Sequence, residues 1–140
     1  MIPSDIAAQF KALCHQANAI DAVTLDIGDI EPVLVALLKL VQSHPEQRPL
    51  FIELFLAVAD GVIETPPELL PFCMRTLRYP EIKAHFLAEC AGDQTTARFR
   101  RRMNFISHMM HAFDDPIWEG AAFWPYYVHE HHKGNTTEGS

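Results

Sequence analysis

The sequence contains few cysteines and few glycines, and both shortages narrow the range of functions. The three cysteines, Cys14, Cys73 and Cys90, are odd in number and far apart, which argues against a disulfide framework. Each falls where a helix would bury a small apolar side chain, so we expect free thiols in a reducing compartment. With six glycines in all, the chain has no phosphate-binding loop, no G-x-G-x-x-G and no G-x-S-x-G motif. No sequence motif therefore indicates catalysis.

Long apolar runs are also missing. The longest, such as residues 33–38, have six residues, whereas a membrane-spanning helix needs about 20. The first ten residues lack the basic segment and apolar core of a secretory signal. We therefore expect a cytoplasmic protein without a membrane partner.

Positive charge is scarce in the first half of the chain. Residues 1–70 contain ten acids and three bases, whereas residues 71–140 contain eight of each, so the first half carries the whole net charge of −7. An acidic surface disfavours nucleic acid and suits a basic protein partner. The alternative is that the charge only keeps the protein soluble.

Apolar residues recur at helical spacing throughout the chain, and no segment alternates like a strand. A length of 140 residues and a hydrophobic content of 49% fit a single helical domain over residues 1–129 with its own core. The polar residues 130–140 are expected to be disordered. We expect about seven helices. Six of them cover residues 4–23, 30–43, 46–60, 66–79, 80–91 and 94–113, and the last begins at residue 116.

Capping residues set the expected helix ends. Thr65 and Glu68 have the spacing of a capping box, with Pro66 at the first helical position. Pro80 separates that helix from the next, which Gly92 would end in a left-handed conformation. Ser4, Asp29 and Asp93 are the expected N-caps of three other helices. Gly61 is expected to end the helix over residues 46–60 in a left-handed conformation.

Short corners join these helices, so neighbours should form antiparallel hairpins over about 30–60, 66–91 and 94–131. The segments PPELLPFCMRTL and YPEIKAHFLAECA resemble short HEAT-type repeats. That resemblance implies an α-solenoid, in which each unit packs on its neighbours. An irregular helical bundle is the alternative architecture.

Two further segments, RYPEI and FDDPIWE, resemble helical immunity proteins that neutralise bacterial polymorphic or contact-dependent toxins. The resemblance implies a non-catalytic module that binds and blocks a basic, nuclease-like toxin and needs no cofactor. Trp and Tyr near acids in the last helix are typical of interfaces. The candidate partner-binding residues are Asp26, Asp29, Glu31, Asp114, Asp115, Trp118 and Glu119.

A metal-dependent helical enzyme, with its metal site on the last long helix, is an alternative to the protein-binding module. His108, His111 and Asp115 are spaced so that one helix face could direct all three at an ion. The pattern matches no established ligand motif, and a histidine near a helix end can be explained by the helix dipole alone. Residues 129–132 have the sequence HEHH. Histidine-rich segments of this kind bind metals adventitiously, and this one lacks the spacing of an HExxH motif.

A nucleic-acid adaptor is the other alternative, because residues 98–102 contain the one basic run. Successive residues turn by about 100° around a helix, so Arg98, Arg100, Arg101 and Arg102 surround the helix and do not form one patch. The simpler interpretation is a solvated face whose arginines pair with acids such as Glu89 or Asp93.

Overall fold

The computed structural model describes residues 2–24 and 26–114, and every regular element in this part of the chain is helical. The predicted all-α class is therefore confirmed. The expected helix from residue 116 and the tail over 130–140 lie outside the described residues. The elements are α1 (Pro3–Asp21), α2 (Ile27–Gln42), the short 3-10 helix η1 (Pro45–Gln47), α3 (Arg48–Ala59), α4 (Leu69–Leu77), α5 (Pro80–Ala91) and α6 (Ala97–Asp114).

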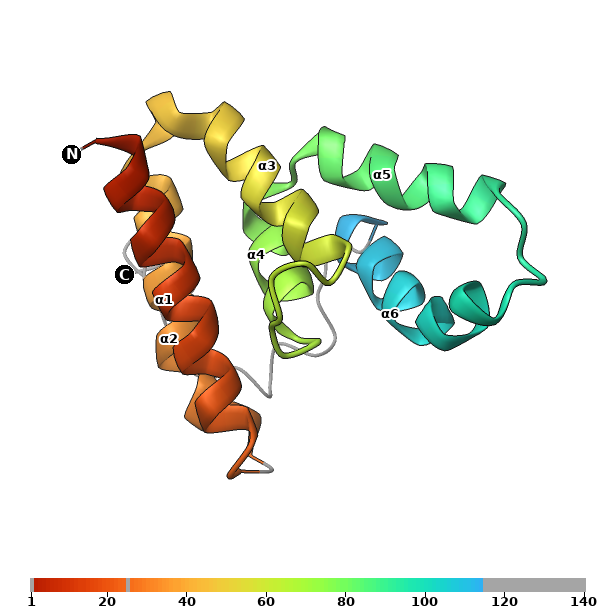
Figure 1. Cartoon of the computed structure of the whole chain (residues 1–140), viewed down its shortest axis with the longest axis horizontal. Coiled ribbons are helices and arrows are strands. Elements are labelled where there is room, and N and C mark those ends of the chain that lie inside the picture. Colours follow the sequence, from red (N-terminus) through yellow and green to blue (C-terminus); the bar gives the residue numbers. More distant parts are fainter. Residues whose placement is uncertain (1, 25, 115–140) are drawn as a thin grey trace, which may run out of the picture.

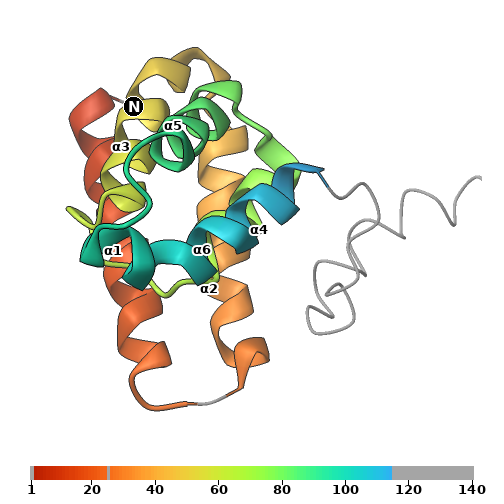
Figure 2. The same ribbon diagram turned by 90° about the vertical axis from the view of Figure 1, so that its right-hand side faces the viewer.

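The helices form two groups that share one core. Helices α1 and α2 make a long antiparallel hairpin on one side, and α3 to α6 lie on the other (Figure 1). The most extensive contacts join α1 to α2 and α4 to α6, while α5 packs on both α6 and α3. The main partner of α2 is thus α1 and that of α4 is α6, so these contacts do not follow the expected pairs 30–60 and 66–91. Figure 2 shows the tip of the α1–α2 hairpin projecting beyond the other helices.

Aromatic rings connect the two groups. The ring of Phe10 on α1 packs edge to face on Phe55 of α3, with centroids 5.1 Å apart. Phe55 in turn meets Tyr79 at the corner between α4 and α5, at 6.0 Å. Further fully buried residues from the remaining helices complete the core: Leu34, Leu37, Leu69, Leu70, Met74, Phe86 and Met109.

Helix α2 begins three residues before the expected position. The carboxylate of Asp26, not that of Asp29, accepts the hydrogen bond of the cap, from the Gly28 N–H at 2.9 Å. Asp29 instead accepts from the Thr24 hydroxyl at 2.7 Å. Ile30, in the first turn of this helix, is only 2% exposed and belongs to the core.

The predicted capping box at Thr65 and Glu68 is wrong. Helix α4 begins at Leu69 and has no side-chain cap. Pro66 is buried, and its carbonyl accepts from the Leu69 N–H in a turn. The side chain of Asn18 donates to the Glu64 carbonyl oxygen at 2.5 Å. These contacts with the rest of the fold stabilise an irregular segment where local sequence favours a helical turn.

Two other helix starts also differ from the predictions. Helix α6 begins at Ala97 because Thr96 is its cap and accepts from the Phe99 N–H at 3.1 Å. The Asp93 carboxylate accepts from the backbone N–H and the hydroxyl of Thr95 in the preceding turn. Helix α1 has Ile2 at its cap position with no side-chain bond, so Ser4 is not its cap.

The helix ends follow the expected chemistry at one glycine and depart from it at the other. Gly61 is left-handed, with φ 79°, and closes α3 as predicted, and the adjoining Val62 is 79% exposed. Gly92 is extended, with φ −79° and ψ −164°, so that prediction is wrong. The left-handed residue is Arg78, with φ 53°, because the helix must end before the Tyr79–Pro80 corner.

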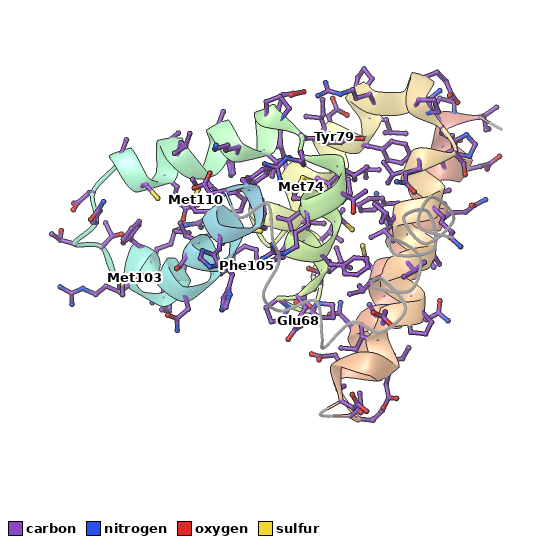
Figure 3. The ribbon with its side chains drawn as sticks, turned by 180° about the vertical axis from the view of Figure 1, so that it is seen from behind. Glu68, Met74, Tyr79, Met103, Phe105 and Met110 are labelled. Atoms are coloured by element: carbon purple, nitrogen blue, oxygen red, sulfur yellow. The ribbon has the colours of Figure 1, made fainter. Side chains whose placement is uncertain are left out.

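Two large apolar side chains of α5 and α6 lie outside the buried faces of these helices. Leu87 is 48% exposed and Met103 54% exposed, while Met109 is fully buried. In Figure 3, Met103 lies toward the start of α6, far from α4, whereas Met110 lies nearer to it. The start of α6 therefore extends past the core.

The aromatic contact between α1 and α3 should dominate stability. We expect Phe10→Ala to lower the free energy of unfolding by about 3–5 kcal/mol, because it leaves a cavity at a fully buried position. The control Val62→Ala, at an exposed position, should change it by less than about 0.5 kcal/mol. Urea unfolding followed by circular dichroism measures both, and equal effects would contradict the packing described.

Candidate functional site

The acids that the sequence suggested in the first half do not all reach the surface. Asp26 and Asp29 are exposed at the start of α2. Glu31 is only 2% exposed, because its position on α2 faces the rest of the fold. Its assignment as a partner-binding residue is therefore corrected, and it contributes no accessible charge to that surface.

The second predicted group falls mostly outside the described residues, which include Asp114 but not Asp115, Trp118 or Glu119. Asp114 ends α6 and pairs with Lys83 of α5, with Oδ1 and Nζ 3.2 Å apart. The start of α2 and the end of α6 lie in different parts of the molecule in both ribbon views (Figures 1 and 2). Asp114 is thus not part of one surface with Asp26 and Asp29.

The tip of the α1–α2 hairpin forms an acidic surface of its own. We define the acidic tip as Asp21, Val23, Asp26 and Asp29, all exposed. No Lys or Arg occurs between Lys11 and Lys39, so the hairpin supplies no cation beside these carboxylates. Val23 is 86% exposed and adds apolar area among the charges. Negative charge around an exposed aliphatic side chain is suited to a protein contact.

The alternative metal site is incomplete in the described part of the chain. His108 and His111 are both exposed on α6, and the third proposed ligand, Asp115, lies outside the described residues. Among residues 2–24 and 26–114, no group of three or more His, Cys, Asp or Glu side chains is placed to hold a metal ion.

The four arginines of α6 have different environments. Arg98, Arg100 and Arg101 are exposed, whereas Arg102 is partly buried. The Nε and Nη2 atoms of Arg102 donate to the two carboxylate oxygens of Glu89, at 2.6 and 3.0 Å. Its Nη2 also donates to the carbonyl oxygen of Ala59, at 2.9 Å. The predicted pairing with Glu89 is confirmed, and Arg102 joins α6 to α5 and to the end of α3.

A groove that the sequence did not indicate lies beside Arg102. It has a volume of about 420 Å³ and is formed by segments far apart in the sequence. No local motif could have predicted it, since α1, the end of α3, the loop after it and α6 each contribute a few residues. The lining residues are Asn18, Val58, Ala59, Gly61, Ile63, Glu64, Thr65, Pro67, Arg101, Arg102 and Phe105.

Titratable groups elsewhere have structural causes for their pKa shifts. The hydrogen bond from Arg48, with Nη1 2.5 Å from Oε2, lowers the pKa of Glu81. Hydrogen bonds from Thr95 lower the pKa of Asp93. Burial raises the pKa of Cys14 to about 12 and raises that of Cys73 as well. All three cysteines are free thiols, as predicted.

Comparison with known proteins found no match to this chain among protein-family models, curated proteins or solved structures. Within the described residues, no helix combines the length and apolar character that crossing a membrane would require.

The Arg102 contacts should stabilise the fold measurably. We expect Arg102→Ala to lower the free energy of unfolding by about 1–3 kcal/mol, because Glu89 and the Ala59 carbonyl lose a shared donor in a partly buried site. Arg102→Lys should recover only part of this loss, since an ammonium cannot reproduce the planar fork. Arg101→Ala is the matched control on the next residue and should cost less than about 0.5 kcal/mol. A similar loss in Arg101→Ala would refute this account.

Thiol reactivity provides a separate test of the packing. Because the thiolate is the reactive form, burial and a raised pKa should protect Cys14 and Cys73 in the folded protein. Cys90 is partly exposed and should react first with a thiol reagent such as DTNB. We expect one fast thiol in native protein, none in Cys90→Ser, and full reaction of all three only after unfolding. Fast reaction of either buried cysteine would contradict the structure.

Proposed function

We propose that this protein is a non-catalytic protein-binding module that meets a basic partner through its acidic tip. The observation that supports the proposal most is that Asp21, Val23, Asp26 and Asp29 are all exposed near the α1–α2 connection, where the hairpin projects beyond the other helices (Figure 2). A tip that projects beyond the other helices has a shape that can enter a concave basic surface.

The proposed mechanism is steric occlusion aided by electrostatic steering. Carboxylates at the tip attract a basic surface before contact, which raises the association rate and makes it depend on salt. Val23 then supplies apolar contact once the surfaces meet. In the finer form of this proposal, the module is an immunity protein in the cytoplasm, and the partner is a basic, nuclease-like toxin whose active site it covers.

A charge-neutralised tip tests this function. We expect the triple variant Asp21→Asn, Asp26→Asn, Asp29→Asn to associate with the captured partner roughly tenfold more slowly at low salt, because steering is lost. Asparagine retains the capping oxygen at position 26, so α2 should keep its start. The partner would be captured from a lysate of the native host, identified by mass spectrometry, and its binding kinetics measured at low and high salt.

The matched control removes the same charge elsewhere in the first half. Asp5→Asn, Glu46→Gln and Glu53→Gln change exposed acids outside the acidic tip, and this triple variant should bind almost as fast as the wild type. Equal slowing in the two triple variants would show that only net charge matters. Salt-independent association of the wild type would overturn the steering mechanism itself.

A further inference from the structure

The groove beside Arg102 has the dimensions and the lining of a small-ligand site. Its volume of about 420 Å³ falls within the usual range for such sites, about 300–1,000 Å³. The partly exposed Ile63 and Phe105 give it apolar surface, and Asn18 and Thr65 add polar groups. This mixture of apolar walls and a few polar groups is typical of pockets that bind and orient one small molecule.

The groove walls are fixed by hydrogen bonds within the protein. Asn18 donates to the Glu64 carbonyl and holds the loop after α3 against α1. Arg102 donates to the Ala59 carbonyl and holds α6 against the end of α3. The left-handed Gly61 directs the loop between these contacts. The groove is therefore largely preformed, and ligand binding would order few additional protein groups.

One cation in the groove remains available. Arg102 is committed to Glu89 and Ala59. Arg101 also lines the groove, yet it has no hydrogen-bond or ion-pair partner in the described part of the chain. Glu64 lines the same groove, and its backbone carbonyl accepts the hydrogen bond from Asn18. The groove thus presents one guanidinium whose donors are not satisfied by another side chain.

We propose that the groove binds a small apolar monocarboxylate, with its carboxylate on Arg101 and its aromatic or branched body against Ile63 and Phe105. The planar guanidinium matches a carboxylate with two parallel hydrogen bonds. A dianionic phosphate ester would carry a second charge toward Glu64 with no second free cation. This site is separate from the acidic tip, and it does not depend on the proposed partner.

The probe is 3-phenylpropionate, titrated into isotope-labelled full-length protein and followed by amide chemical shifts. Its neutral analogue 3-phenylpropionamide and inorganic phosphate are titrated in parallel. We expect saturable shifts at groove residues with the carboxylate, binding about threefold to tenfold weaker with the amide because an exposed ion pair contributes modestly, and no saturation with phosphate.

Two arginine variants locate the carboxylate. Arg101→Gln should weaken 3-phenylpropionate binding about threefold to tenfold and leave amide binding unchanged. Arg98→Gln removes an equal charge from an exposed position of the same helix outside the groove and should bind like the wild type. Circular dichroism of both variants confirms that the helices are intact.

Specific outcomes would overturn the proposal. The absence of saturable shifts in the groove would mean that it is not a site for this ligand class. Equally weakened 3-phenylpropionate binding in Arg98→Gln and Arg101→Gln would show that binding depends on the net charge of the helix and not on a contact with Arg101. Tighter binding of phosphate than of the carboxylate would instead show an anion site of different chemistry. Loss of partner binding in the acidic-tip variant bears on none of these results.

Discussion

The contact of Phe10 with Phe55 holds the two groups of helices together. It joins the α1–α2 hairpin to α3, and the ring of Phe55 also packs on Tyr79 at the α4–α5 corner. Arg48 stacks on that tyrosine, 4.8 Å from the ring centre, and pairs with Glu81 at the start of α5. The groove depends on this packing, since Asn18 of α1 lines it together with Val58 and Ala59 of α3.

The sequence predicted the helical class and several element positions for good physical reasons. Residues 80–91 form a helix with the expected bounds, because Pro80 fixes the start and the apolar spacing fixes the face. Capping was less predictable, since more than one residue near each start could accept the same backbone hydrogen bonds. Asp26 and Thr96 accept these bonds, whereas the predicted caps Asp29 and Asp93 accept bonds from Thr24 and Thr95. Sequence spacing alone does not distinguish such neighbours.

The candidate sites differ in how far sequence could reveal them. An acidic tip is local in the chain, so Asp26 and Asp29 could be selected from charge alone, whereas the burial of Glu31 required the packing of α2. The groove depends on Asn18, Ile63 and Phe105 meeting in space. Such an assembly leaves no periodic or motif signal, because each residue is ordinary in its own helix or loop.

The left-handed Arg78 makes the geometry of the α4–α5 corner depend on a distant helix end. A non-glycine residue in this conformation costs about 1–2 kcal/mol, and its Nη2 donates to the Phe113 carbonyl at the end of α6. A glycine at position 78 would relieve the backbone but leave that carbonyl without this donor. Corner and helix end therefore constrain each other's sequence, although 35 residues separate them along the chain.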